Sequence, residues 1–83
     1  MITSKTPKLD LHGEITSMVQ VLVDEFIHDS VIQKHDEVII IHGKSTNILT
    51  KEVHQVLRNN KDVASYKINN WNVGETIVKL NKQ

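Results

Sequence analysis

The chain contains no cysteine, one proline, three glycines and one each of tryptophan, tyrosine and phenylalanine among its 83 residues. Without cysteine it can form neither a disulfide framework nor a cysteine zinc site, and nothing in the sequence indicates an oxidising compartment. The first residues, MITSKTPK, lack the apolar core of a signal peptide, and no apolar run is long enough to span a bilayer. These absences predict a cytoplasmic protein that has no membrane partner.

Net charge is also lacking, because ten Lys and Arg residues balance ten Asp and Glu residues when the five histidines are neutral. This balance argues against a protein that holds long stretches of duplex through charge alone. The charges are unevenly placed: residues 1–42 carry three basic and seven acidic side chains, whereas residues 43–83 carry seven basic and three acidic ones. The second half can therefore present a modest basic face, although surface charge often serves only solubility.

The chain is too short for two hydrophobic cores, and no repeat or linker divides it. We expect a flexible N-terminus over residues 1–8, which are polar and include Pro7, followed by a single domain over residues 9–83. In that domain, alternating or β-branched segments typical of strands are interspersed with segments whose apolar residues are spaced by three and four, as in helices. The order of these segments predicts an α/β fold with the elements β-α-β-α-β-β.

Strands are expected at KLDLH (8–12), EVIIIH (37–42), VASYKIN (63–69) and TIVKL (76–80). A first helix is expected from about residue 16 to 29, with Thr16 or Ser17 capping its start. A second helix has buried positions from Leu49 to Leu57 and ends near RNNKD (58–62). The segment NWNVGE (70–75) is expected to form a hairpin loop.

Two of the predicted strands end in the same dipeptide, His12-Gly13 and His42-Gly43. If the first helix connects these strands within one sheet, the strands are parallel, the crossover is right-handed, and both carboxyl ends lie at one edge of the sheet. Open α/β sheets bind ligands at such an edge. The second turn also leads into a helix, whose free N–H groups favour anions, and Lys44 lies beside it. A phosphate group is the expected ligand.

The side chains at this edge suit acid–base chemistry on a phosphodiester. Asp10 and His12 are two positions apart on a strand, so they share a face on which the carboxylate can orient the imidazole. Because histidine as a residue type titrates near neutral pH, the pair His12 and His42 is suited to act as general base and general acid. The groups that can offset negative charge on the phosphoryl oxygens are Lys44 and the amides around Ser45, Thr46 and Asn47.

Other interpretations of these residues stay open. Asp10, His12 and His42 can be read as an open three-ligand metal site, although the short HxxxH or HxxE spacing of such sites is missing. The remaining histidines, His28, His35 and His54, are read as structural or surface residues. Trp71 lies among asparagines in the last loop, where an exposed ring can stack on a base, but a lone tryptophan more often covers a small core.

Taken together, these motifs resemble the small MutS-related (Smr) domain family. LDLHG (9–13) matches the first motif of that family in full. IHGKSTNIL (41–49) resembles its His-Gly-Lys-Gly-Thr-Gly-x-Leu motif, and VGETIVKL (73–80) resembles its closing Gly-Ala-Thr-x-Val-x-Leu motif. The sequence departs from the family pattern at Ser45 and Asn47, which replace glycines, at Thr50, which replaces a common arginine, and at Trp71 and Asn72, which replace paired glycines.

The resemblance implies a two-layer α/β sandwich with two helices on a four-stranded mixed sheet, similar to the C-terminal domain of translation initiation factor three. It also implies nucleic-acid binding and, as in several members, nicking of DNA or cleavage of RNA. In this interpretation Asp10, His12 and His42 are catalytic, DNA or RNA is the partner, and no cofactor is assigned, with a divalent metal as an open alternative. The residues expected to bind phosphate or nucleic acid are Gly13, Gly43, Lys44, Ser45, Thr46, Asn47, Trp71 and Gly74.

Three functions are therefore compared. The leading one is a nicking endonuclease for DNA or RNA, with DNA repair as its setting. The second is a non-catalytic module that binds branched nucleic acid or ribosomal RNA, so that the ribosome becomes a partner. The third is a protein-interaction domain whose His-Gly edge has lost its role. Because the chain begins with methionine and carries no ATPase, we expect a stand-alone member of the family or a domain excised from a MutS-type protein.

Overall fold

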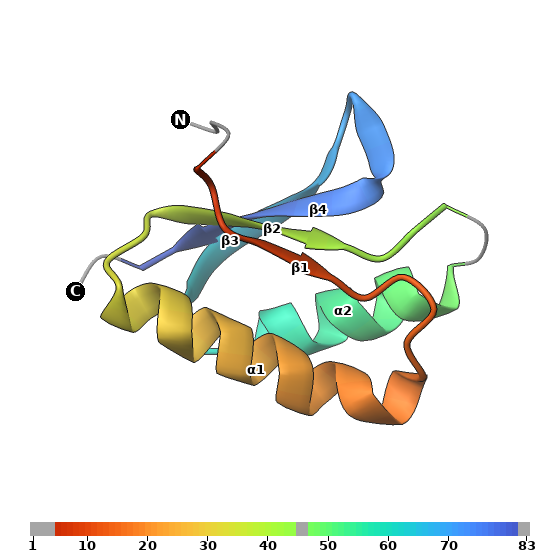
Figure 1. The fold of residues 1–83 in the computed structure, drawn as a ribbon, viewed down its shortest axis with the longest axis horizontal. Helices are drawn as coiled ribbons and strands as arrows, with labels where there is room; N and C mark the ends of the chain where they lie inside the picture. The colour runs from red at the N-terminus through yellow and green to blue at the C-terminus, as the bar shows by residue number, and fades with distance from the viewer. Residues whose placement is uncertain (1–4, 45–46, 82–83) are drawn as a thin grey trace.

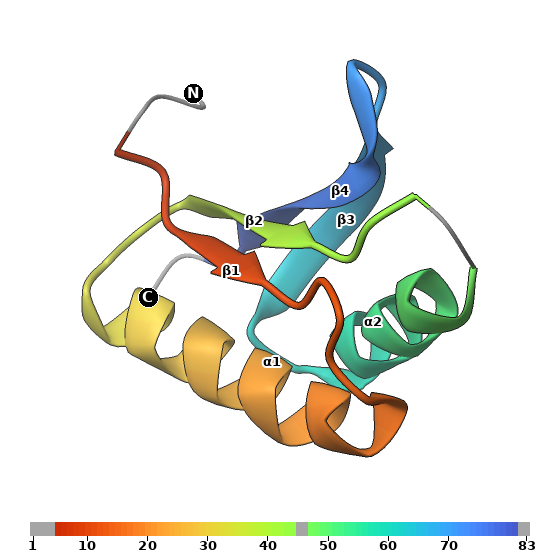
Figure 2. The ribbon, with the colours of Figure 1, turned by 45° about the vertical axis from the view of Figure 1, so that its right-hand side comes forward.

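The structure, a computed structural model, describes residues 5–44 and 47–81. Its elements follow the order β1 (Lys8–Asp10), α1 (Thr16–Ile32), β2 (Glu37–Ile41), α2 (Ile48–Asn59), β3 (Val63–Asn69) and β4 (Asn72–Leu80). Both helices cover the same face of a four-stranded sheet, as Figures 1 and 2 show, and the other face carries no helix. The predicted β-α-β-α-β-β order and the two-layer α/β sandwich are confirmed.

The sheet has the strand order β1-β2-β4-β3. β1 and β2 are parallel, whereas β4 is antiparallel to both of its neighbours, β2 and β3, so the sheet is mixed. The helix α1 connects the two parallel strands and brings their carboxyl ends to one edge of the sheet. Because β4 runs the other way, its first residues lie at that same edge, and the β3–β4 hairpin extends beyond it (Figure 2).

The core fills the space between the sheet and the two helices. Strand alternation points Leu9, Val38 and Ile40 toward the helices, while Lys8, Asp10, Ile39 and Ile41 share the uncovered face. The apolar stripes of α1 and α2 complete the core from the other side. Its fully buried members include Leu11, Val19, Val23, Ile27, Val38, Ile40, Val53, Leu57 and Val78.

Several element boundaries differ from those predicted. The first helix continues to Ile32, three residues beyond its expected end, because Ser30 is still buried against the domain and the chain turns only at Lys34, which has a φ of 65°. The predicted cap at Thr16 or Ser17 is wrong. Ile15 occupies the cap position without a side-chain hydrogen bond, and Thr16 is already helical.

The last strand also begins earlier than predicted. Because Asn72 pairs with Asn69, β4 begins at Asn72, and only Asn70 and Trp71 are left as the turn between β3 and β4. The first strand is shorter than KLDLH, since it ends at Asp10. Pro7 belongs to the sheet, because its carbonyl accepts a hydrogen bond from the N–H of Ile39 (2.9 Å). Neither helix in the described part of the chain has the length and apolar character that crossing a membrane requires.

Candidate functional site

The two His-Gly turns meet at the edge of the sheet where the parallel strands end. Gly13 and Gly43 have φ angles of 82° and 86°, which residues with a side chain rarely adopt. The ring of His12 packs against Gly43, since a Cβ on Gly43 would lie 3.5 Å from Cδ2 of His12. The ladder also continues one residue past β1, where the N–H of Leu11 donates to the carbonyl of Ile41 (2.7 Å). The topology therefore joins two segments that are thirty residues apart in the sequence.

The third motif, VGETIVKL (73–80), begins at the same edge of the sheet, near the start of β4. The carbonyl of Gly74 accepts hydrogen bonds from the N–H groups of both His42 (2.9 Å) and Gly43 (3.0 Å). A Cβ on Gly74 would lie 3.1 Å from Cγ of Lys44 and 3.3 Å from the carbonyl carbon of Gly43, so a larger residue there would displace the lysine stem or the turn. Gly74 thus lets the turn after β2 lie directly against the start of β4.

Asp10 and His12 are both exposed at this edge, as strand alternation predicts. The carboxylate Oδ1 of Asp10 accepts a hydrogen bond from the backbone N–H of His12 (2.9 Å). The aspartate therefore holds the main chain of the turn, and the imidazole is positioned through that turn and through its packing on Gly43. The ring of His12 is left accessible to a ligand that approaches the edge.

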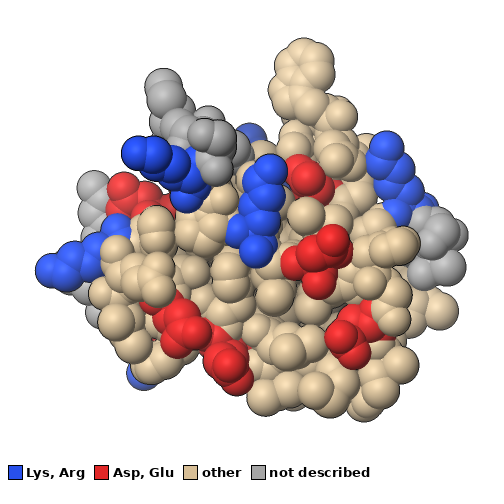
Figure 3. Space-filling model, in the orientation of Figure 1, with Lys and Arg blue, Asp and Glu red and all other residues tan. Residues whose placement is uncertain are grey.

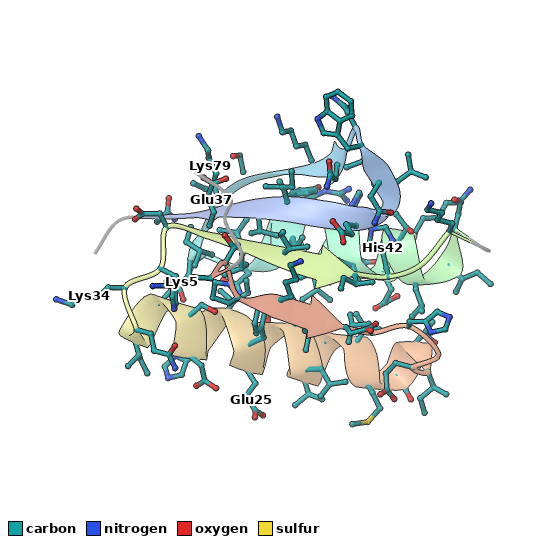
Figure 4. All side chains as sticks on the ribbon, turned by 45° about the horizontal axis from the view of Figure 1, so that its top comes forward. Lys5, Glu25, Lys34, Glu37, His42 and Lys79 are labelled. Carbon is teal, nitrogen blue, oxygen red and sulfur yellow. The ribbon has the colours of Figure 1, made fainter. Side chains whose placement is uncertain are left out.

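His42 has a different environment from His12, because its side chain is only 3% exposed. It follows Val38 and Ile40 in the alternation of β2 and therefore points toward the helix layer. Its Nδ1 lies 2.8 Å from Oγ1 of Thr50 and 3.1 Å from the carbonyl of Gly43, and its Nε2 lies 2.8 Å from Oγ1 of Thr76. Figure 4 shows His42 at the end of β2. The structure brings the two turns together but not two exposed imidazoles.

A buried network surrounds His42, and sequence reasoning did not identify it. Oγ1 of Thr76, which is fully buried, lies 2.8 Å from Nε2 of His42 and 2.8 Å from Nε2 of His54. A hydroxyl has one hydrogen, so it can donate to only one of the two rings and must accept from the other if both bonds form. The ring of His54 also packs edge-on against Tyr66, with 4.9 Å between ring centroids. Three strands and α2 are joined through these contacts.

The network shifts the titration of His54. Burial lowers the pKa of His54 below its ordinary value of 6.5, and positive charge on His42 and on Arg58 lowers it further. Among the described residues, the ring lies near His42 just after β2, Tyr66 of β3, Thr76 of β4 and Arg58 from the next turn of α2. None of them carries a negative charge near neutral pH, so the neutral imidazole is favoured in the folded state.

This shift predicts that acid destabilises the fold. Because the pKa of His54 is lower in the folded than in the unfolded chain, the unfolded chain binds more protons between the two values, and stability rises with pH there. The contribution is complete above about pH 6.5 and is lost as the pH falls through the folded pKa. Urea unfolding from pH 7.5 to 5 should show this slope, and His54→Gln should flatten it. If the free energy of unfolding of His54→Gln depends on pH as steeply as that of wild type, His54 is not the source of the pH dependence. The matched control is His28→Gln, at an exposed position of α1.

Several of the residues expected to bind phosphate lie in the turns around this edge. Lys44 is exposed beside Gly74, and Asn47 is the N-terminal cap residue of α2, with no side-chain capping bond. Gly13 is exposed at the turn after β1. Ser45 and Thr46 lie outside the described residues.

Two further expectations are answered by the structure. Trp71 does not cover the core, because it is 95% exposed at the tip of the β3–β4 hairpin. The residues that the structure describes bring together no group of three His, Asp or Glu side chains that could hold a metal ion, so the alternative three-ligand site at Asp10, His12 and His42 is not formed. In the view of Figure 3, Lys and Arg are mixed with Asp and Glu and do not form a single basic patch.

Comparison with known proteins places this geometry in context. Residues 9–81 match the sequence model of the Smr domain. A protein named endonuclease MutS2 from Helicobacter pylori is 36% identical over 75 residues, which are 90% of this chain but 10% of that protein. The chain therefore spans about a tenth of the length of the curated relatives that it matches.

Two solved structures have the same fold. The Smr domain of Thermus thermophilus MutS2 superimposes with a TM-score of 0.87 at 24% identity, covering 92% of this chain and 99% of that one. YdaL, a stand-alone small MutS-related protein from Escherichia coli, gives a TM-score of 0.86 at 26% identity, covering 95% of this chain and 70% of that one.

Proposed function

Because the chain belongs to the Smr domain family, we propose that it binds DNA or RNA at the edge formed by its two His-Gly turns and nicks a phosphodiester bond there. The observation that carries the proposal is the packing of His12 on Gly43, with Lys44 beside Gly74. This arrangement places an exposed imidazole and an exposed ammonium group at one sheet edge, beside the start of α2. The relatives named endonuclease support the reaction class, since they share this part of their sequence with the chain.

The proposed chemistry assigns each group at the edge one task. Neutral His12 accepts the proton of the attacking water or hydroxyl, whose oxygen forms a bond to phosphorus while the bond from phosphorus to the leaving oxygen breaks, and the leaving oxygen takes up a proton from solvent. Asp10 keeps the turn that carries His12 in place through its bond to the backbone. Lys44 offsets the charge that develops on the phosphoryl oxygens.

The role of His42 in proton transfer stays a prediction. Its two ring nitrogens are within hydrogen-bond distance of Thr76 and Thr50, so direct contact with a phosphate would require these contacts to break. In the present geometry we propose that His42 acts by holding Gly43 and Thr50 in place, through the carbonyl of Gly43 and the hydroxyl of Thr50. A setting in DNA repair, a ribosomal partner and a cytoplasmic location likewise stay predictions.

A second function is favoured by one specific observation. Of the two histidines expected to share acid–base catalysis, only His12 is exposed at the edge. An edge with one accessible imidazole can bind a phosphate without cutting it. The alternative is therefore a module that binds branched nucleic acid or ribosomal RNA without cleavage.

Cleavage assays on purified protein separate the two functions. Supercoiled plasmid and a structured RNA are incubated with the chain, with and without a chelator, and the products are resolved on gels. Nicked plasmid or discrete RNA fragments that increase with protein concentration support the endonuclease. Binding in a gel-shift experiment without any product above background supports the binding module, and the absence of both binding and products would refute both proposals.

The phosphate contact of Lys44 leads to a quantitative prediction. We expect Lys44→Gln to weaken nucleic-acid binding and to lower the slope of log affinity against log salt concentration by about one, because one fewer counterion is released. Fluorescence anisotropy of a labelled oligonucleotide at several salt concentrations measures this slope. Lys61→Gln is the matched control, since Lys61 is an exposed lysine just before β3, whose first residue pairs with Leu80 at the far end of the sheet. Equal slopes for wild type and Lys44→Gln would contradict the contact.

A further inference from the structure

The most exposed large apolar side chain among the described residues is Trp71, whose ring is 95% accessible at the tip of the β3–β4 hairpin. The hairpin tip, residues 69–72, projects beyond the sheet at the end where β2 terminates (Figure 2). A tryptophan in such a position leaves most of its apolar surface in water, which is costly unless a partner covers it. A ligand that stacks on a single aromatic face would cover this ring.

The hairpin tip is held in place by its own asparagines. The N–H of Trp71 donates to Oδ1 of Asn69 (3.0 Å), and the N–H of Gly74 donates to Oδ1 of Asn72 (3.0 Å). The amide of Asn69 also donates to Oε1 of Glu75 (3.1 Å). These side-chain bonds fix the turn on both sides of the tryptophan, so the ring is presented by a preorganised backbone.

The surroundings of Trp71 distinguish a base from a protein partner. A stable protein interface buries about 800 Å² on each side, with a cluster of apolar residues at its centre. Beside Trp71 the chain offers asparagines at positions 69, 70 and 72, and the nearest exposed apolar side chain is Val73. One aromatic face, with the amide of Asn70 and the NH₂ group of Asn72 near it in the chain, matches the size and polarity of a single nucleobase, which can stack on the ring and hydrogen-bond at its edges.

The position of the tip relative to the His-Gly edge supports the same ligand. The carbonyl of Gly74 accepts hydrogen bonds from the N–H groups of His42 and Gly43, and Trp71 precedes Gly74 by three steps of extended chain, about 10 Å. This length corresponds to roughly three base steps of a stacked strand. One strand can therefore present a phosphate at the edge and a base at Trp71.

We propose that Trp71 stacks on an unpaired base a few nucleotides from the phosphate held at the His-Gly edge, and so directs the protein to nucleic acid with a single-stranded loop, end or gap. This inference rests on the proposed function and adds the structural state of the substrate to it. A base inside a duplex is covered on both faces by its neighbours, so a fully paired, blunt-ended duplex offers no free face to the ring. The ligand is defined by its unpaired base, whether the sugar is ribose or deoxyribose.

Intrinsic fluorescence tests this inference directly, because Trp71 is the only tryptophan of the chain. The full chain is titrated with a 12-nucleotide single strand and with a blunt duplex of the same sequence, and binding is followed independently by the anisotropy of a dye on the nucleic acid. We expect quenching of tryptophan emission with the single strand. We also expect Trp71→Leu to weaken single-strand binding by roughly 5- to 150-fold while duplex binding changes little. Trp71→Phe should restore part of the loss, since it retains an aromatic face, whereas Trp71→Leu retains only apolar character.

The outcomes separate this inference from the proposed function. If anisotropy reports binding of the single strand but tryptophan emission does not change, the inference fails and the proposed function stands. Equal loss of single-strand and duplex affinity in Trp71→Leu would also overturn it. An emission change that depends on protein concentration without nucleic acid would identify a second copy of the chain as the partner of Trp71 and refute the base. If neither nucleic acid binds, both proposals fall.

Discussion

Replacing His12 with alanine is expected to lower plasmid nicking or RNA cleavage by about 100-fold or more, while Tm changes by about 4 °C or less. A positioned general acid or base contributes roughly 10²- to 10⁴-fold to the rate, and His12 carries the exposed imidazole at the edge. Its removal leaves no buried cavity, and an exposed substitution of this kind changes stability by about 0.5 kcal/mol or less. Initial rates of nicking, measured together with thermal unfolding, give both quantities from one preparation.

Two further variants complete the test of His12. His28→Ala makes the same chemical change at an exposed position of α1 and should retain the wild-type rate. Asp10→Asn keeps an oxygen that can accept the N–H of His12 but removes the carboxylate charge, so it separates positioning of the turn from an electrostatic effect. If His12→Ala and wild type show the same trace of product, the enzyme proposal is lost and the non-catalytic binding module becomes the better account.

The fold was predictable because its signals are local and independent. The alternation of KLDLH, the β-branched run EVIIIH and the spaced apolar stripe of the first helix each identify one element. The right-handed crossover rule then predicts that the two His-Gly turns meet, as the packing of His12 on Gly43 shows. The start of β4 was misplaced because residues 72–75 are typical of turns, whereas Asn72 pairs with Asn69 of β3 and Glu75 pairs with Ile41 of β2.

The environment of His42 was the main feature that sequence reasoning missed, although a signal was present. His42 alternates in phase with Val38 and Ile40, whose side chains fill the core, so strand parity places its ring in the helix layer. Asp10 has the opposite phase and is exposed. Parity does not identify the network around His42, because its partners Thr50 and Thr76, and His54 beyond Thr76, come from two other elements and meet only after packing.

The accessible tryptophan could not be foreseen for a related reason. A lone tryptophan in a small domain is a good candidate to complete the core, and only the register of the hairpin decides whether it does. The core between the sheet and the helices is already closed by aliphatic residues such as Leu57, Val78 and Leu80. The two-residue turn then leaves Trp71 beyond the last paired residues, Asn69 and Asn72, where the side chain is exposed.

Replacing His42 with alanine is expected to destabilise the fold by about 3 kcal/mol. The substitution removes a buried ring and leaves a cavity, and it also leaves the hydroxyl of Thr76 without one of its partners. For a domain of this size, such a loss lowers Tm by about 10 °C or more. Urea unfolding monitored by circular dichroism measures the change, with an unaltered m-value as evidence that unfolding is still two-state.

The same prediction limits what an inactive His42→Ala variant can mean. The loss of the His42 ring frees Gly43 and Thr50 from their contacts, so the loop beside Lys44 is disturbed even if His42 never touches the substrate. A double-mutant cycle with Thr76→Val measures the coupling directly, since residues joined by a buried hydrogen bond give interaction energies of about 0.5–3 kcal/mol. A coupling near zero together with an unchanged free energy of unfolding would contradict the positioning role. In that case, lost activity in His42→Ala would argue that the imidazole itself exchanges protons with the substrate.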